Sequence, residues 1–296
     1  MQQLNEIAIA TCKSHPGFCA NDDAPLLEAF REHNVNAELI SWDDATTDWS
    51  QFDAVIIRTT WDYMDRLDEF LAWVDRVDSV SRIMNPPSVV RRNLDKAYLR
   101  DLETAGVPIV PTRWIDPSES EKLEQILRGA DWPELIIKPT VGAGASGLGR
   151  FTLDQLDEAI THTKEQLTRG VTMAQPMLDS ITTTGELSIV LLDGEFAHAI
   201  RKVPAEGDFR VQIEFGGNYT RVEPTPQEID IAVRAHNLAA GDHAPLLYSR
   251  ADIVEPTPGN PALIEFEAVE PELFFPIAPE SAQRFAELAL ERLATA

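Results

Sequence analysis

The sequence has few cysteines and no long hydrophobic run. Its two cysteines, Cys12 and Cys19, lack the spacing of a common zinc site. No apolar stretch approaches the roughly 18–20 residues that a membrane helix needs. The first residues, MQQLNEIAIA, also lack the basic and long apolar regions of a signal peptide. We therefore expect a cytoplasmic protein with reduced thiols and no membrane partner.

Positive charge is also scarce. The 296 residues include 49 acidic and only 25 basic side chains, so the net charge is −24 at pH 7. Such a surface repels the phosphates of nucleic acid, which makes nucleic acid a poor partner. Only six of the basic residues are lysines, and Lys96, Lys138 and Lys202 each lie next to a motif described below. These three lysines are therefore candidates for functional roles.

Strand and helix patterns alternate through the first 88 residues. We expect strands at residues 6–11, 37–40 and 54–57, and helices at 24–33 and 67–77, with Asp22 and Asp23 capping the first helix. This alternation is typical of a small parallel α/β domain. Asn85-Pro-Pro87 then breaks the pattern and indicates a linker.

After the linker the pattern becomes mixed. We expect helices at residues 94–105 (capped by Asn93), 119–127, 154–166, 229–240 and 279–293. Strands are expected at 107–111, 135–137, 171–174, 186–192, 196–203, 209–213, 248–254 and 263–267. Asp193-Gly194 predicts a two-residue hairpin turn between two of these strands.

A glycine-rich stretch, LIIKPTVGAGASGLGRF, runs from Leu135 to Phe151. A strand-like run delivers Lys138, and Gly142, Gly144, Gly147 and Gly149 follow it. Glycines let backbone N–H groups converge on one point, and such a concavity binds phosphate. The lysine precedes the glycines, so this is not the common P-loop. The stretch predicts a phosphate-covering loop in a nucleotide site; a flexible hairpin tip is the alternative.

Three carboxylates point to a metal site. Glu265 and Glu267 are two residues apart, so in a strand their side chains lie on the same face. A hairpin through residues 256–261 would bring Asp252 beside them. Converging carboxylates repel one another unless a cation joins them, and oxygen ligands suit Mg²⁺ or Mn²⁺. The alternative is an exposed strand face in a very acidic protein.

Two further groups of side chains are candidates for the site. His15, Arg58, Trp61, Asp62 and Tyr63 follow predicted strands of the first domain, where parallel sheets bind ligands. They predict a polar and aromatic pocket wall, unless an Arg–Asp pair only holds a loop while the aromatic rings cover the core. A basic group on the later β stretch, comprising Arg201, Lys202 and Arg210, could clamp a transferring phosphoryl group.

The order of these motifs resembles the ATP-grasp superfamily. The motifs that carry the resemblance are Asn93-Leu-Asp-Lys96, Ile137-Lys138-Pro139 with its glycine loop, Gly185-Glu-Leu-Ser188, Asp208-Phe-Arg210 with Gly216-Gly217, and Asp252 with Glu265-Phe-Glu267. The chain looks closest to the branch that holds prokaryotic glutathione synthetases, ribosomal-protein glutamate ligases and the O-ureido-D-serine cyclo-ligase of cycloserine biosynthesis. Arg58-Thr-Thr-Trp-Asp-Tyr63 and Val269-Glu-Pro-Glu-Leu-Phe-Phe275 look most like the cyclo-ligase subgroup.

The resemblance implies an α/β protein with an N-terminal parallel α/β (pre-ATP-grasp) domain, followed by an ATP-grasp fold of two α+β lobes. The boundaries that we expect are 1–88 for the first domain, 89–178 for the N-lobe and 179–296 for the C-lobe. It also implies an ATP-dependent carboxylate–amine ligase that works through an acyl phosphate on a small amino-acid-like substrate. An intramolecular cyclo-ligase, a phosphotransferase and a non-catalytic ATP-sensing protein are alternatives, and a homodimer or a homotetramer is compatible with the resemblance.

Residue roles follow from the motif positions. Lys96 and Lys138 would contact the ATP phosphates, and the loop of Gly142, Ala143, Gly144, Ala145, Ser146 and Gly147 would close over them. Gln175, Pro176, Met177 and Leu178 would face adenine, and Asp179 or Glu186 the ribose. Asp252, Glu265 and Glu267 would hold two Mg²⁺ ions, although many relatives have Asn in place of Glu267. Arg210 would stabilise the transferring phosphoryl group, and Arg201, Lys202 and Arg250 would bind the substrate carboxylate or phosphates.

Overall fold

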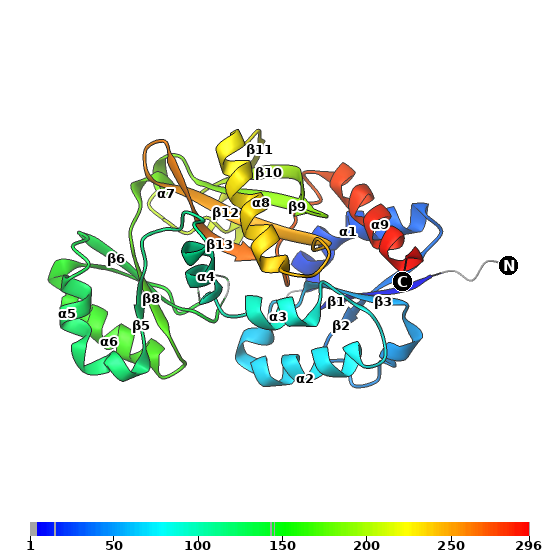
Figure 1. Cartoon of the computed structure of the whole chain (residues 1–296), viewed down its shortest axis with the longest axis horizontal. Helices are drawn as coiled ribbons and strands as arrows, with labels where there is room; N and C mark the ends of the chain where they lie inside the picture. Colours follow the sequence, from blue (N-terminus) through cyan, green and yellow to red (C-terminus); the bar gives the residue numbers. More distant parts are fainter. Residues whose placement is uncertain (1–4, 15, 143, 145, 296) are drawn as a thin grey trace.

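The computed structural model describes residues 5–14, 16–142, 144 and 146–295. These residues form three β-sheets, each with its own helices (Figure 1). Short 3-10 helices lie between successive strands and helices along the chain. They are η1 (Trp49–Gln51), η2 (Tyr63–Arg66), η3 (Pro117–Lys122), η4 (Leu153–Gln155) and η5 (Ile213–Phe215). No helix within the described ranges is both long and apolar enough to cross a membrane.

The first sheet is parallel, as the sequence predicts. Its order is β2-β1-β3-β4, and its strands are β1 (Glu6–Thr11), β2 (Asn36–Ser41), β3 (Ala54–Thr59) and β4 (Ile83–Met84). Helices α1 (Pro16–Glu32) and α2 (Leu67–Asp78) cover its two faces. The predicted cap at Asp22 and Asp23 is wrong, because both residues lie inside α1. Their carboxylates face the buried Arg58 instead of the helix N-terminus.

The second sheet is antiparallel and carries the glycine-rich stretch. Its order is β5-β8-β6-β7, with β5 (Arg113–Ile115), β6 (Glu134–Pro139), β7 (Gly149–Thr152) and β8 (Thr172–Pro176). Helices α5 (Leu123–Arg128) and α6 (Leu156–Leu167) pack against it through a common apolar core. The strand predicted at 107–111 is wrong. Within the described residues, Ile109 makes only an isolated bridge to Leu263, since the flanking prolines lack N–H donors.

The helix predicted between the first two sheets is also shorter than expected. The predicted helix at 94–105 is shortened to α4 (Tyr98–Thr104), and a separate helix, α3 (Pro87–Asn93), precedes it. Asn93 therefore ends one helix instead of capping the next. Its side chain is bound to the backbone of the third sheet, as described below.

The third sheet is antiparallel and has the order β11-β10-β9-β12-β13. Its strands are β9 (Glu186–Leu192), β10 (Glu195–Val203), β11 (Asn218–Val222), β12 (Tyr248–Thr257) and β13 (Asn260–Glu267), and its helices are α7 (Asp179–Thr183) and α8 (Pro226–Ala240). The Asp193-Gly194 hairpin is confirmed, with φ of 54° and 82° at the two residues. The strand predicted at 209–213 is wrong, because the Asp208 carboxylate accepts hydrogen bonds from the Phe209 and Arg210 amides and holds a turn there.

The last helix, α9 (Pro279–Ala294), returns to the first domain. It packs beside α1, as Figure 1 shows for the red and blue helices, and Phe285 joins Ile7, Ile9 and Phe30 in one buried cluster. The two α+β lobes that follow the parallel domain agree with the predicted fold class. The C-terminal helix nevertheless completes the core of the first domain, so the packing units do not follow the chain order.

Candidate active site

A cavity of about 530 Å³ opens where the three sheets meet. Its wall carries most of the predicted site residues, namely Lys96, Lys138, Gly142, Gly144, Ser146, Gln175, Pro176, Met177, Glu186, Lys202, Arg210, Arg250, Asp252, Glu265, Glu267 and Trp61. Its volume lies in the range of pockets for nucleotides and other small molecules. The fold thus assembles in one place side chains that are up to about two hundred residues apart in the sequence.

The glycine-rich loop forms one side of this cavity. It connects β6 and β7, which are paired as far as Ile137 and Gly149, so Lys138 lies at the point where the hairpin opens. Gly142, Gly144 and Ser146 line the cavity, whereas Gly147 packs on Pro139 and Gln166. The φ of +71° favours glycine at residue 147, and an added Cβ would also lie only 3.1 Å from Pro139 Cδ. Ala143, Ala145 and His15 lie outside the described residues.

Two lysines approach the loop from different elements. Lys96, just before α4, donates to the carbonyl of Gly142, and its Nζ lies 3.0 Å from Glu265 Oε1. Burial opposes the charged form of Lys96, but Glu265, Glu267 and Glu270 outweigh that effect and raise its pKa. Burial lowers the pKa of Lys138, and the nearby positive charge of Lys96 lowers it further. Both groups are therefore placed to gain from an anionic ligand such as a triphosphate.

The three predicted metal ligands are brought together. Asp252 on β12 pairs in register with Glu265 on β13, and one carboxylate oxygen from each of these residues and from Glu267 lies within 4.8 Å of the others. Arg250 Nη2 lies 2.8 Å from Asp252 and 2.9 Å from Glu267. Ser188 Oγ donates to Asp252 at 2.5 Å. The donor set is all oxygen and suits Mg²⁺.

The protonation of these carboxylates reflects the crowding of negative charge. Burial alone would raise the pKa of Asp252, but Arg250 and Lys202 lower it to about 2. Burial, together with Glu265 and Asp252, raises the pKa of Glu267 to about 8 despite Arg250. A divalent cation held by the three carboxylates would stabilise the charged form of Glu267 and lower its pKa. This behaviour fits a metal site better than a solvated strand face.

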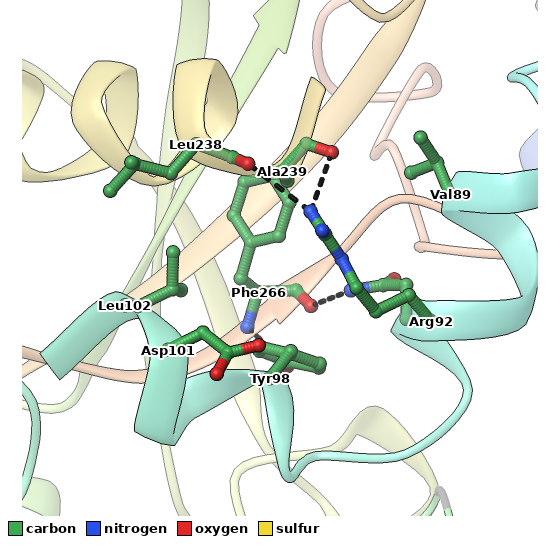
Figure 2. A pocket seen from close by; sticks show the side chains of 9 residues that line it. Val89, Arg92, Tyr98, Asp101, Leu102, Leu238, Ala239 and Phe266 are labelled. Atoms are coloured by element: carbon green, nitrogen blue, oxygen red, sulfur yellow. Dashed lines mark hydrogen bonds between the residues drawn. The ribbon is translucent and has the colours of Figure 1, made fainter. Parts of the chain in front are cut away.

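A hydrogen-bonded anchor holds the strand that carries Glu265 and Glu267. The Asn93 side chain donates to the carbonyl of Phe266 at 2.9 Å and accepts from the amide of Ala268 at 2.6 Å. The Phe266 amide donates to the Tyr98 hydroxyl at 2.8 Å, and Figure 2 shows this contact beside a small cavity of about 90 Å³. The anchor therefore fixes the backbone around the two glutamates along the outer edge of the sheet.

Asn93→Ala should weaken metal use more than it weakens folding. It would leave the Phe266 carbonyl and the Ala268 amide without their partners, and a lost buried hydrogen bond costs about 1–3 kcal/mol. We expect the Mg²⁺ concentration for half-maximal activity to rise about tenfold in a magnesium titration of ADP release.

The neighbouring Arg92→Gln is the matched control. Arg92 donates to the carbonyls of Leu238 and Ala239 at the end of α8 and does not reach β13 in the described structure (Figure 2). It should lower the melting temperature without changing the magnesium dependence. An unchanged magnesium dependence in Asn93→Ala would contradict a positioning role for Asn93.

The adenine end of the predicted site is apolar. Gln175, Pro176 and Met177 line the cavity together with Ile136 and Ile264. The Gln175 side chain is buried and donates to Thr112 Oγ1 at 2.9 Å. The described wall of the cavity includes neither Leu178, predicted to face adenine, nor Asp179, predicted for the ribose. Glu186, the other residue predicted for the ribose, does lie on this wall. Glu186 Oε1 lies 2.5 Å from Lys202 Nζ.

The first domain contributes less to the wall than the sequence suggests. Trp61 lines the cavity, with Nε1 donating to the Glu270 carbonyl at 2.8 Å. Arg58 is fully buried, 2.7 Å from Asp22 and 3.0 Å from Asp23, and so matches the alternative of an Arg–Asp pair. The Tyr63 hydroxyl donates to Glu270 at 2.5 Å, and the Asp62 carboxylate accepts from Trp42 at 2.7 Å. The described wall of the cavity includes neither Tyr63 nor Asp62.

The basic residues divide between two faces of β10. Lys202 faces the cavity, whereas Arg201 points to the other face and its nearest carboxylate is Glu228 at 3.9 Å. This follows from the alternation of side chains along a strand. Arg210 lines the cavity from the turn before η5, where it pairs with Asp208 at 2.7 Å and lies 3.7 Å above the Phe215 ring.

Sequence reasoning missed several residues of the wall. Met64, Phe209, Phe215, Tyr219 and Glu272 line the cavity but have no predicted role. Glu272 belongs to the Val269–Phe275 motif that resembles the cyclo-ligase subgroup, so a signal for it was present. Tyr219 follows the Gly216-Gly217 motif, yet nothing in its local pattern distinguishes it from an ordinary strand residue.

Comparisons with known proteins agree with this geometry. Residues 7–85 match the family described as D-cycloserine synthetase DcsG, N-terminal domain, and residues 108–253 match the prokaryotic glutathione synthetase ATP-grasp domain. The chain is 35% identical to the cycloserine biosynthesis protein DcsG of Streptomyces lavendulae, over 92% of this chain and 94% of that protein. It is 27% identical to the glutathione synthetase of Mesorhizobium japonicum, over 64% of this chain and 58% of that protein.

The solved structures give the same result. The crystal structure of D-cycloserine synthetase DcsG superposes with a TM-score of 0.89 at 32% identity and covers 98% of this chain and 100% of that chain. The ATP-grasp ligase PsnB in complex with a minimal precursor shares the fold, with a TM-score of 0.64 at 17% identity, over 97% of this chain and 100% of that chain. The D-cycloserine and glutathione synthetases among these relatives are ATP-dependent ligases that form C–N bonds, and ATP-grasp ligases use ATP and Mg²⁺. The chain therefore belongs to the D-cycloserine synthetase family of ATP-grasp ligases.

Proposed function

We propose that this enzyme phosphorylates the carboxylate of a small amino-acid-like substrate and then closes a ring with a nitrogen of the same molecule. The observation that carries the proposal is the cavity itself, which gathers five cationic side chains and three carboxylates that could hold a metal ion around one space. Binding of a nucleotide alone does not require this full set for phosphoryl transfer. The resemblance to D-cycloserine synthetase over nearly the whole chain supports a ring-forming reaction.

The cavity residues divide the chemistry between them. Lys96 and Lys138 bind the ATP phosphates, and the backbone at Gln175–Met177 faces adenine. Asp252, Glu265 and Glu267 would hold two Mg²⁺ ions, which Mn²⁺ could replace, and the metal would neutralise the negative charge of the phosphates. Arg210, which lines the cavity from the turn held by Asp208, stabilises the transferring phosphoryl group.

The reaction proceeds in two steps. A substrate carboxylate oxygen attacks the γ-phosphorus of ATP, and ADP leaves. The substrate nitrogen then attacks the carbonyl carbon of the acyl phosphate, the bond to the phosphate oxygen breaks, and the nitrogen loses its proton. Lys202 and Arg250 lie on the wall beside the carboxylates, where they can neutralise the tetrahedral oxyanion. Closure of the loop over the triphosphate excludes water from the acyl phosphate.

The product decides between the candidate reactions. Attack by the ureido nitrogen of O-ureido-D-serine would form N-carbamoyl-D-cycloserine, and hydrolysis of its carbamoyl group by water would leave D-cycloserine with carbon dioxide and ammonia. With ATP, Mg²⁺ and this substrate, we expect the cyclic product, ADP and free phosphate in equal amounts, measured by mass spectrometry and a phosphate assay. Lys138→Ala should abolish all three. A product formed from two substrate molecules would indicate condensation instead. A phosphorylated product without free phosphate would indicate a phosphotransferase, and ATP binding without turnover a sensing protein.

The proposal includes the organisation of the chain. Residues 1–88, 89–178 and 179–296 serve as the first domain, the N-lobe and the C-lobe, with α9 added to the first domain. A cytoplasmic homodimer or homotetramer is expected from the family resemblance, and light scattering measures which of the two forms.

A further inference from the structure

One half-buried carboxylate on the described cavity wall has no lysine or arginine within 4.0 Å. The other buried or half-buried carboxylates of the wall each have a lysine or arginine within 4.0 Å, namely Glu186, Asp252, Glu265 and Glu267. Glu272 has no such ion pair among the described residues. Its carboxylate receives one long hydrogen bond, from the Tyr219 hydroxyl at 3.4 Å.

The backbone that presents Glu272 is held in place from two directions. Arg250 Nη1 donates to the Glu272 carbonyl at 3.2 Å, and the Leu273 amide donates to Asp22 at 3.2 Å. The preceding carbonyl, of Pro271, accepts from Arg58 at 2.7 Å. This segment has no regular secondary structure, yet side chains from both the first domain and the third sheet fix it. The Glu272 side chain therefore projects into the cavity from a preorganised support.

The charges around Glu272 compensate the negative charge of its carboxylate only in part. Burial, followed by the negative charge of Asp22, raises its pKa to about 7, and Arg250 and Lys202 only partly offset this. The ion pairs of Arg250 and Lys202 are formed with Asp252, Glu267 and Glu186. A half-buried carboxylate without a partner is costly unless a ligand supplies one. Glu214 also lines the wall without an ion pair among the described residues, but it is exposed, and water satisfies it.

An amino-acid-like substrate has the matching charge. Its carboxylate must lie near the metal and phosphate groups, and its α-ammonium group then needs an anion elsewhere on the wall. We propose that Glu272, supported by Tyr219, binds the α-ammonium group of the substrate and so determines the preference of the enzyme for amino acids over other carboxylic acids. This inference rests on the proposed function and names a substrate-binding residue within it.

The test compares two substrates that differ only in the amine. They are O-ureido-D-serine and 3-(ureidooxy)propionate, which lacks the α-amino group, and ADP release is measured with each. A charge-assisted hydrogen bond should make the wild type prefer the amine-bearing substrate in kcat/KM by about 10- to 100-fold. In Glu272→Gln that preference should largely disappear, with the KM for ATP unchanged, and Glu272→Asp should retain part of it. Glu206→Gln is the matched control, since Glu206 is an exposed carboxylate outside the cavity wall in the described structure.

The outcomes separate the inference from the proposed function. An equal loss with both substrates in Glu272→Gln would overturn the role of Glu272 and leave the ligase reaction standing. If the wild type turned over neither substrate, the proposed function would fail. Calorimetry with the same two compounds and an ATP analogue would then decide the inference alone. Tighter binding of the amine-bearing compound to the wild type but not to Glu272→Gln would support it, and equal binding would contradict it.

Discussion

Glu265→Gln should lower kcat by about 10³-fold, which corresponds to about 4 kcal/mol of lost transition-state stabilisation. Glu265 is the central member of the three carboxylates, opposite Asp252 in the β12–β13 register and two residues from Glu267. Lys96 and Lys138 outweigh burial and lower the pKa of Glu265, so it is charged at neutral pH. The substitution keeps the shape of the side chain and removes a ligand charge. Phosphate release at saturating ATP and Mg²⁺ measures the effect.

The control for this prediction lies on the same hairpin. Glu255→Gln makes the same charge change on β12, at a residue outside the cavity wall in the part of the chain that the structure describes. It should retain wild-type activity, and both variants should keep the wild-type melting temperature within a few degrees. A Glu265→Gln enzyme with more than a tenth of the wild-type kcat would show that Glu265 is not a metal ligand.

Arg58→Met should lower the free energy of unfolding by about 3–5 kcal/mol. The Arg58 guanidinium is fully buried, 2.7 Å from Asp22 and 3.0 Å from Asp23, and it also donates to the Pro271 carbonyl. Its removal leaves two carboxylates in the core with no cation. Burial already raises the pKa of Asp23 to about 6 even with Arg58 present. Urea denaturation followed by circular dichroism measures the loss as a lower midpoint.

The triple variant Asp22→Asn, Asp23→Asn, Arg58→Met provides the comparison. With no buried charge left, it should recover most of the lost stability, because the cost arises from the unpaired carboxylates. The alternative is that Arg58 binds substrate directly. In that case Arg58→Met would raise the KM for the substrate while leaving the denaturation midpoint unchanged.

Much of the site could be predicted from local patterns. Lys138 lies next to the glycine loop in the sequence, and Glu265 lies two residues from Glu267. The alternation of side chains along a strand places the two glutamates on one face. The parallel first domain likewise followed from the alternation of strands and helices. For these features the relevant spacing is short, so a single stretch of sequence contains the information.

Other assignments depended on contacts between distant residues. Asp22 and Asp23 have the pattern of a helix cap, but their partner is Arg58, more than thirty residues later. Asn93 also looks like a cap, yet its side chain binds the backbone of β13. Local propensity is a weak energy that tertiary partners readily outweigh, which is why these capping predictions failed.

The sequence by itself determined the class of protein and named the phosphate loop and the three carboxylates of the metal site as candidates. Only the tertiary structure decided which polar groups share one cavity. It removed Arg58 and Tyr63 from the wall and Arg201 from the inner face of β10, and it added Glu272. The reason is physical: whether a charge is paired, buried or exposed depends on side chains that the fold brings from elsewhere in the chain.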